Sequence, residues 1–382
     1  MRAPLTGLKV LDLSRVLAGP FAGQLLADLG ATVVKVESPH GDDTRGWGPP
    51  FIERDDGSRD AAYFHACNRG KHSLVADLCV IDDLQQVKQL AACADVLLEN
   101  FKVGGLVKFG LDPAAMREKH PALIYCSITG FGQNGPKASQ AGYDLMVQGL
   151  SGIMSLTGDP DGEPQKMGTA FADIFTGLYS VIAIQAALAA RTTTGLGQQI
   201  DMALLDTMTG VLANQAMNYL ASGVAPQRMG NAHPNIVPYQ VFTVQDGHVI
   251  IAVGNDGQFL RLCNVLNCQN LSNDDRYATN SGRVKHRDQL ISQLEKHLSL
   301  WRREELLAVL ENATVPAGPI HDVGEALNDP QFVGRGMRIE RDGIPGLATP
   351  ITFEEKALAS KLPSPSLGSV SFDEALELFG RS

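Results

Sequence analysis

The sequence has few charged residues, and acidic side chains outnumber basic ones. Charged residues make up 19% of the 382 positions, and 32 Lys and Arg against 42 Asp and Glu give a formal net charge of −10. This balance argues against general binding of nucleic acid or of anionic membranes, which needs a broad basic surface. A local basic pocket for a small polyanion remains compatible with it. Hydrophobic residues reach 44%, enough for a sizeable core, so we do not expect intrinsic disorder.

Cysteine is also scarce. The six cysteines form no C-x-x-C pair, and several lie among aliphatic residues. This pattern predicts neither a zinc cluster nor a disulfide framework. We identify no signal or transit peptide before the first predicted strand, and no apolar run long enough to cross a bilayer. We therefore expect reduced thiols, no metal, no membrane partner and a cytoplasmic location.

Common nucleotide and hydrolase signatures are missing. No G-x-G-x-x-G follows the first predicted strand, where the turn spans Ser14–Pro20. The chain also has no P-loop, H-E-x-x-H or G-x-S-x-G motif. A dehydrogenase assignment is therefore weak, and the fold class alone does not give the function.

Short apolar strands alternate with helices in the first third of the chain. A proline-to-glycine pattern predicts a helix over Phe21–Leu29, and the spacing of Leu84, Val87 and Leu90 predicts another over Asp82–Ala94. This alternation predicts an α/β fold with a Rossmann-like parallel sheet covered on both faces. The predicted strands are Val10–Leu13, Thr32–Glu37, His72–Leu78, Asp95–Asn100 and Ala122–Ser127.

The pattern changes after Gly223. Long helices are predicted over 170–190 and 204–220, whereas Tyr239–Val244 and His248–Val253 flank an Asp-Gly turn that is typical of a hairpin. Amphipathic helices follow at 283–298 and 302–310, and a last helix is predicted near 373–378. We predict a large α/β domain over 1–224, completed by 326–382, and a small α+β domain over 225–325.

Basic residues follow or precede several predicted strands. In a parallel sheet, loops at the carboxyl ends of strands bind ligands, and Arg and Lys in such loops suit phosphate groups. A solvated surface charge explains any single lysine equally well or better. The basic and amide residues concerned are Arg15, Lys71, Asn100, Lys102 and Lys108.

Asp173 is the carboxylate that stands out, because it lies in the first turn of an otherwise apolar helix. It could complement the helix dipole, or it could be a partly desolvated nucleophile. Tyr143 and Asp144 form either a loop motif or a second active-site pair. The segment Gly254–Gln258 is either a plain turn or a mobile flap with backbone donors.

Together these segments resemble the class III CoA-transferase family, the group of formyl-CoA transferase and carnitine CoA-transferase. The matching segments occur in the family's order along nearly the whole chain. Two further segments, Trp47–Pro50 and Asn231–Gln240, are most similar to the succinyl-CoA:glutarate (or hydroxymethylglutarate) branch. The family segments are Gly7–Leu13, Leu17–Pro20, Leu29–Ala31, Val34–Glu37, Gly41–Arg45, Glu99–Phe101, Ser127–Gly132, Ala141–Asp144 and Ala172–Gly177.

The resemblance implies transfer of CoA from an acyl-CoA, such as succinyl-CoA, to a carboxylate, such as glutarate. The family's nucleophile falls on Asp173, which would form an anhydride and then an aspartyl-CoA thioester. CoA is then a substrate, no cofactor is implied, and the expected assembly is an interlocked homodimer. For a distal substrate carboxylate we hypothesise Arg45 or Arg228.

The resemblance also implies a role for further residues. Gly254, Asn255 and Gly257 would form the oxyanion flap, and the acyl pocket would comprise Trp47, Tyr63, Tyr143 and Asp144. The residues that match or neighbour CoA-contacting positions are Arg15, Lys71, Asn100, Lys102, Lys108 and Lys137.

Some residues depart from the family pattern. Leu17 and Ser38 replace a glutamine and an arginine of formyl-CoA transferase, which argues against oxalate and formate as substrates. An α-methylacyl-CoA racemase would share the fold and the aspartate, but Tyr143 stands where its histidine would fall, and tyrosine is a much weaker base at neutral pH. We therefore favour a transferase over a racemase and over a CoA-binding protein without catalysis.

Overall fold

The chain folds into two compact units in this computed structural model, which describes residues 3–54, 56–354 and 356–380. The first unit comprises Met1–Ile153, Lys166–Val224 and Asp329–Ser382, and the second comprises Met154–Gln165 and Ala225–Asn328. The short excursion Met154–Gln165 was predicted as part of the large domain. The structure instead groups it with the second unit, where the Arg228 guanidinium donates to the carbonyls of Asp159 and Gly162.

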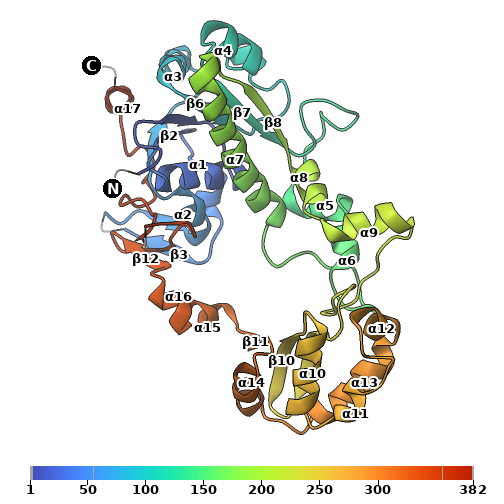
Figure 1. The fold of residues 1–382 in the computed structure, drawn as a ribbon. Coiled ribbons are helices and arrows are strands. Elements are labelled where there is room, and N and C mark those ends of the chain that lie inside the picture. Colours follow the sequence, from blue (N-terminus) through green and yellow to red (C-terminus); the bar gives the residue numbers. More distant parts are fainter. Residues whose placement is uncertain (1–2, 55, 355, 381–382) are drawn as a thin grey trace. The chain divides into compact units, whose positions relative to one another are not determined.

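A six-stranded parallel sheet lies at the centre of the first unit (Figure 1), in the order β5-β2-β1-β6-β7-β8. It confirms the predicted α/β class with a parallel sheet. The chain leaves β1 toward one edge and returns to the other side of β1 at β6, so the carboxyl ends of β1 and β6 form the switch point where such sheets bind ligands. The strands are β1 Lys9–Asp12, β2 Thr32–Glu37, β5 Lys71–Val75, β6 Val96–Glu99, β7 Ile124–Thr129 and β8 Gln199–Ala203.

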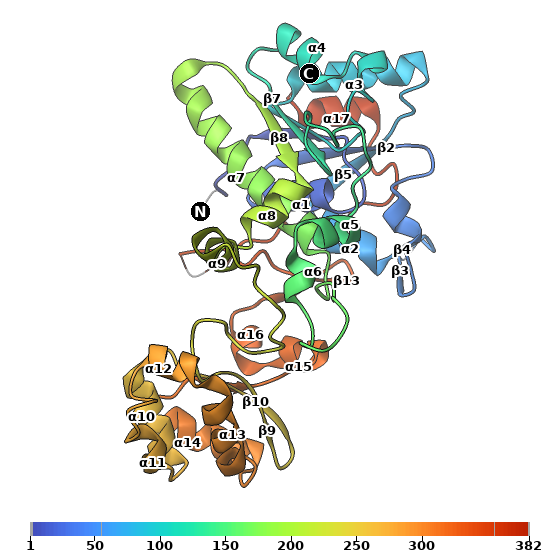
Figure 2. The same ribbon diagram turned by 90° about the vertical axis from the view of Figure 1, so that its right-hand side faces the viewer.

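Alternate residues of the strands enter two separate cores. Val10, Val33 and Val96 pack against the helices of one face, and Leu11, Val34 and Leu97 pack against those of the other. The parallel strands are therefore apolar on both sides, which explains their continuous apolar runs. The first face carries α1 Ala18–Asp28, α7 Phe171–Thr194 and α8 Leu204–Gly210, and the second carries α3 Ile81–Cys93, α4 Pro113–Lys119 and α17 Phe372–Leu378 (Figure 2).

Helix α7 corrects one expectation from the sequence. Its 24 residues are long and apolar enough to cross a membrane by length and composition, which we had not expected of any segment. In the structure α7 packs closely on α1, since a Cβ at Gly177 would lie 2.8 Å from the carbonyl oxygen of Ala18. The core helices of soluble proteins pass the same test, so this finding by itself assigns no membrane role.

The C-terminal tail binds along the β5 edge of the sheet. The Val370 N–H donates to the Ser73 carbonyl, and the Ser73 N–H and hydroxyl bond to Ser369 and Gly368. Helix α17 follows, begins with a capping box between Ser371 and Glu374, and packs on α3. The tail is therefore part of the first unit.

The second unit has its own core under a three-stranded antiparallel sheet. The hairpin consists of β9 Tyr239–Val244 and β10 Gly247–Ala252, close to the predicted strands, and β11 Ala317–Pro319 adds the third strand. The principal helices are α10 Asp256–Val265, α13 Arg287–Leu298 and α14 Arg303–Asn312. Helix α12, Asn280–Lys285, is separate, whereas a single helix over 283–298 was predicted.

The predicted helix over 204–220 is also divided. It ends at Gly210 and resumes as α9, Asn214–Ser222, because Ala213 adopts a φ of 45° that no α-helix accommodates.

The remaining elements are η1 Asp43–Gly46, β3 Phe51–Glu53, β4 Arg59–Ala61, α2 Ala62–Asn68, η2 Val107–Phe109, α5 Asp144–Leu150, α6 Ile153–Leu156, α11 Gln269–Ser272, α15 Val323–Asn328, α16 Pro330–Gly334, β12 Arg338–Arg341, β13 Ile344–Leu347, β14 Thr352–Phe353 and β15 Lys356–Ala357.

Candidate active site

Asp173 lies in the first turn of α7 and lines a cavity of about 160 Å³ in the first unit. Asp173 is surrounded by residues from three loops that are separate in the sequence. The cavity is formed where the loops after β1, β6 and β7 meet the start of α7, as expected at the carboxyl edge of a parallel sheet. The predicted site residues that the structure brings together here are Arg15, Asn100, Lys102, Tyr143, Asp144 and Asp173.

The Asp173 carboxylate has no hydrogen-bond or ion-pair partner in the described part of the chain. Burial, and secondarily the charge of Asp144, raise its pKa from 3.8 to about 7. Such a carboxylate is more basic than an ordinary aspartate, and its oxygens are not engaged by other protein groups. It therefore has the properties of a nucleophile rather than of a structural acid.

Tyr63 and Trp47 lie beside this site without lining the cavity. Burial, and then the charge of Asp173, raise the pKa of Tyr63 to about 12, so the phenol stays neutral. The two rings pack edge to face with centroids 5.3 Å apart, and 48% of the Trp47 surface is exposed. This pair forms an apolar wall with a half-exposed edge, and its predicted contact with the acyl group stays a prediction.

The loop after β1 is held in place by its neighbours. The Asn100 side chain accepts from the Arg15 N–H at 2.9 Å and donates to the Arg15 carbonyl at 2.7 Å. Val16 has a φ of 71°, a strained conformation for a β-branched residue, and its N–H donates to the Asp42 carboxylate. Lys35 pairs with Asp42 at 2.9 Å and donates to the Ser14 carbonyl at 2.7 Å. Hydrogen bonds therefore hold Ser14, Arg15 and Val16 of the loop that faces Asp173 in place.

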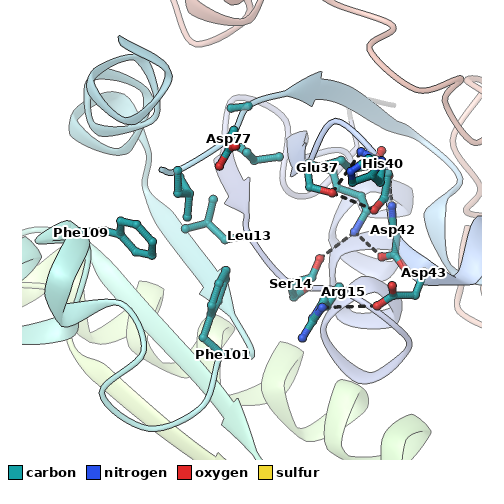
Figure 3. Close-up of a pocket in the computed structure, with 16 residues that line it drawn as sticks. Leu13, Ser14, Arg15, Glu37, His40, Asp42, Asp43, Asp77, Phe101 and Phe109 are labelled. Carbon is teal, nitrogen blue, oxygen red and sulfur yellow. Dashed lines mark hydrogen bonds and ion pairs between the residues drawn. The ribbon is translucent and has the colours of Figure 1, made fainter. Parts of the chain in front are cut away.

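A larger cavity of about 380 Å³ adjoins the first and shares Arg15 and Phe101 with it. Figure 3 shows the rings of Phe101 and Phe109 on one side, and the polar groups around Arg15 and Asp43 on the other. Arg15 and Asp43 lie 3.4 Å apart in an exposed ion pair. The two cavities together provide room for a long ligand with an apolar ring at one end and a reactive group at Asp173.

Comparison with known proteins identifies the family. The family model described as CoA-transferase family III matches residues 5–370. The chain belongs to CoA-transferase family III. It is 55% identical to the succinate–glutarate CoA-transferase of Agrobacterium fabrum over 96% of this chain and 94% of that one. It is 39% identical to the succinyl-CoA:glutarate CoA-transferase of Homo sapiens over 96% and 84% of the two chains.

A solved structure agrees with this assignment. The crystal structure of a CAIB/BAIF family protein from Brucella suis is 59% identical in sequence, covers 99% of this chain and 100% of that one, and superposes with a TM-score of 0.89. The mixed α/β architecture with its large parallel sheet is therefore the architecture of a solved relative. The chain is accordingly a CoA-transferase-family enzyme, as the resemblance had implied.

The structure argues against one predicted CoA ligand of this family III chain. Lys71 is fully buried, and its ammonium donates to Asp12 and to Asn68, both at 2.9 Å. The side chain enters the interior at the start of β5 because Asp12 supplies a buried countercharge there. In this structure the ammonium is engaged by Asp12 and Asn68 and is not available to a phosphate, and the contact of Lys71 with CoA stays a prediction.

Arg45 is likewise not available for a distal carboxylate. Its buried guanidinium donates to both oxygens of Glu37 and to Asp60, and it stacks on the Phe64 ring at 3.7 Å. These contacts argue against the hypothesis that Arg45 binds a distal carboxylate. Arg228 lies in the second unit and donates to two backbone carbonyls.

Two further predicted lysines lie outside the Asp173 cavity. Lys108 is exposed with its ammonium 4.6 Å from the Phe109 ring centroid, next to the larger cavity, and exposed Lys137 lies 5.9 Å from the Phe131 centroid. Their contacts with CoA stay predictions.

The predicted oxyanion flap lies in the second unit at the start of α10. The Asn255 side chain caps this helix by accepting from the Gln258 N–H, and the Gly254 N–H donates to the Gln258 side chain at 2.7 Å. Gly257 follows in the first turn. In this structure the flap residues therefore act as a helix cap, and their role toward an oxyanion stays a prediction.

Sequence reasoning missed the buried ion pairs under the site and one buried glutamine, Gln148. Lys35 and Asp12 each interrupt an apolar strand, which is an unusual place for a charge and was a detectable signal. Gln148 gave no such signal, because glutamine is an ordinary residue in a helix.

Proposed function

We propose that this chain transfers CoA from succinyl-CoA to glutarate and that Asp173 is the nucleophile. The unpartnered, half-buried carboxylate of Asp173, directed at a cavity at the switch point of the sheet, is the observation that carries the proposal. The names of relatives at 55% and 39% identity support the choice of acids.

The reaction proceeds through two activated forms of Asp173. A carboxylate oxygen of Asp173 attacks the thioester carbonyl of succinyl-CoA and the C–S bond breaks. The products are free CoA thiolate and a mixed anhydride between Asp173 and succinate. The thiolate then attacks the side-chain carbonyl carbon of Asp173, and the C–O bond of the anhydride breaks. Succinate is released, and Asp173 is now an aspartyl-CoA thioester. Glutarate attacks this thioester, and the same two steps in reverse release glutaryl-CoA and free Asp173. Both intermediates are activated acyl groups, so no separate energy source is needed.

Local charges suit these steps. Arg15 and Lys102 line the cavity, and their charges attract an anionic acyl-CoA and the departing carboxylate. The raised pKa of Asp173 makes the ionised carboxylate a stronger nucleophile, while a fraction remains protonated near neutral pH. The neutral phenol of Tyr63 adds no further negative charge.

The larger cavity is the proposed place for the adenosine end of CoA. Phe101 and Phe109 offer ring faces for a base, and Lys108 lies beside Phe109 where a phosphate could reach it. Arg15 lies at the junction of the two cavities, where the phosphates and the thiol-bearing arm would pass. CoA is a substrate in this proposal, and no cofactor or metal takes part.

We also propose that the protein is a homodimer. The first unit exposes large apolar side chains on α5, α7 and α9, and such clusters are typical of subunit interfaces. These side chains support a subunit interface, as in the interlocked assembly that the family resemblance implies. The cytoplasmic location expected from the sequence is proposed separately. The exposed residues are Leu145, Met146, Leu150, Tyr179, Ile182, Met217, Tyr219 and Leu220.

Exchange of CoA between acids tests the reaction directly. Purified protein is incubated with a panel of acyl-CoA donors and carboxylic acids, and products are scored by mass. Succinyl-CoA and glutarate are expected to give glutaryl-CoA, and transfer confined to monocarboxylates would contradict the dicarboxylate proposal. Hydroxylamine added during turnover is expected to modify Asp173, as read by peptide mapping; an unmodified Asp173 would refute the covalent mechanism.

A further inference from the structure

A chain of hydrogen bonds connects α5 to the start of α7. The Met167 N–H donates to the side-chain Oε1 of Gln148 at 2.8 Å. The side-chain NH₂ of Gln148 donates to one oxygen of Asp144 at 2.7 Å and, over a longer 3.5 Å, to the Thr169 carbonyl. The other oxygen of Asp144 accepts from the Ala172 N–H at 2.9 Å. Gln148 is fully buried, and Ala172 immediately precedes Asp173. The chain therefore ends next to the proposed nucleophile.

The polarity of this chain is fixed at both ends. Met167 and Ala172 each present a backbone N–H, which can only donate. The Gln148 amide has one acceptor and two donors, so it must turn its oxygen to Met167 and its NH₂ to Asp144. Both oxygens of Asp144 therefore accept, one from Gln148 and the other from the Ala172 N–H, which fixes the orientation of the carboxylate beside Asp173.

We propose that Gln148 is a positioning residue for Asp173: it holds the Asp144 side chain as a double hydrogen-bond acceptor against the first turn of α7, so that the charge of Asp144 stays next to the proposed nucleophile. This inference rests on the proposed nucleophilic role of Asp173. It makes Gln148, which contacts no substrate in this proposal, decisive for the pH range in which Asp173 is ionised.

Other charged or titratable groups around Asp173 come from several elements. They do not replace Asp144, because none of them bonds the first turn of α7 in the described part of the structure. These groups are Arg15 after β1, Tyr63 on α2, Lys102 after β6, and Tyr143 immediately before α5.

A charge exchange between the two positions tests the inference. Asp144→Asn places an amide NH₂ against that of Gln148, and Gln148→Glu places two carboxylates against each other. The double variant D144N/Q148E restores the three bonds that join Met167, position 148, position 144 and Ala172, and gives up only the longer bond to the Thr169 carbonyl. The carboxylate introduced at position 148 accepts from Met167 and from the new amide at position 144, whose oxygen accepts from Ala172. Each single variant is expected to lower kcat/KM by about tenfold or more and to lower the midpoint of thermal unfolding. The double variant is expected to regain most of both.

The pH profile separates positioning from folding. In the double variant the negative charge lies one side chain farther from Asp173, so the rising limb of kcat/KM is expected about half a pH unit or more below that of the parent. The effects of the two single variants on the unfolding midpoint can be added. If the double variant unfolds at the temperature that this sum gives, there is no rescue and the hydrogen-bond chain is refuted. If thermal stability recovers but the limb does not move, the link to Asp173 is refuted.

Gln24 provides the matched control. It is also buried, accepts from the Arg69 N–H at 2.9 Å and donates to the Ala66 carbonyl at 3.2 Å. In a variant that combines Q24E with D144N, the two decreases in the unfolding midpoint are expected to add, because neither change compensates for the other. Q24E alone is expected to leave the rising limb of the kcat/KM pH profile unchanged. Failure of the proposed function is distinguishable, because an Asp173→Asn variant would then retain activity while the Asp144–Gln148 rescue of unfolding persisted.

Discussion

Two groups of buried carboxylates lie close together at the carboxyl end of the sheet, and they differ in one respect. Asp12 and Asp42 face the ammonium groups of Lys71 and Lys35, and although burial opposes it, these charges lower the pKa of both acids. Asp173 is half-buried and has no cation partner among the described residues, so burial, and secondarily the charge of Asp144, raise its pKa to about 7. The same residue type is thus structural where a countercharge is supplied, and it is the proposed nucleophile where the countercharge is missing.

The largest expected effect comes from neutralising the carboxylate that lacks a cation. Asp173→Asn removes the nucleophile, and we expect CoA exchange to fall by at least about 10³-fold while the fold is retained. Asp206→Asn, which alters an exposed acid in the first turn of α8, is the control and is expected to leave exchange within about twofold, as is usual for a surface acid. Equal losses of CoA exchange in both variants would show that exchange does not depend on Asp173 in particular.

The next effect comes from removing the countercharge. Lys71→Met leaves Asp12 buried and unpaired, and we expect the free energy of unfolding to fall by about 3–5 kcal/mol. Chemical denaturation measures it, with Lys108→Met as an exposed control expected to change stability by less than about 0.5 kcal/mol. A folded K71M protein with unchanged stability and a raised KM for acyl-CoA would instead restore Lys71 as a CoA ligand.

The pH dependence of stability should differ in sign between the groups. The raised pKa of Asp173 favours folding below the unfolded-state pKa near 4, and this contribution is lost as pH rises through about 7. The lowered pKa values of Asp12 and Asp42 stabilise the fold above that value, and their contribution is lost as pH falls. At pH 8, Asp173→Asn is therefore expected to stabilise the protein by as much as about 4 kcal/mol, and at pH 4 to have little effect. Unfolding curves at both pH values check this sign.

The smallest expected effect concerns the loop between the two groups. Asn100→Ala removes both side-chain bonds to the Arg15 backbone, and we expect kcat/KM to fall by about tenfold with a loss of about 1 kcal/mol in stability. Steady-state kinetics at several acyl-CoA concentrations measure the change. A rise in KM with unchanged kcat would favour the direct contact with CoA that the family resemblance implies.

The sequence predicted five of the six strands of the sheet, including β5 at one edge, but not β8 at the other edge. Strands such as Thr32–Glu37 are apolar on both faces and were recognised, whereas β8, Gln199–Ala203, lies at the edge with alternating exposed residues and was missed. Local signals also missed the break at Ala213, where the chain takes a positive φ without a glycine.

At the site, sequence reasoning located Asp173 and the loops around it. It could not assign Lys71, because its partner Asp12 is 59 residues away and only the folded sheet brings the two together. The same reason hid one half of the Gln148 bonding, because Met167 lies 19 residues away on another segment, although Asp144 precedes Gln148 by only four residues on α5. Spacing along the chain predicts which residues share an element, but the pairing of buried polar groups is a property of the tertiary structure.

The tail along β5 has a consequence for biosynthesis. Ser73 completes its hydrogen bonds only with Gly368, Ser369 and Val370, and the first two of these lie 295 and 296 residues later in the chain and are synthesised long after it. Until then the β5 edge of the nascent sheet offers unpaired backbone groups to any neighbouring strand. Truncation before residue 368 would therefore yield a polypeptide prone to edge-to-edge aggregation, even though every strand of the sheet and every residue proposed for catalysis had been synthesised.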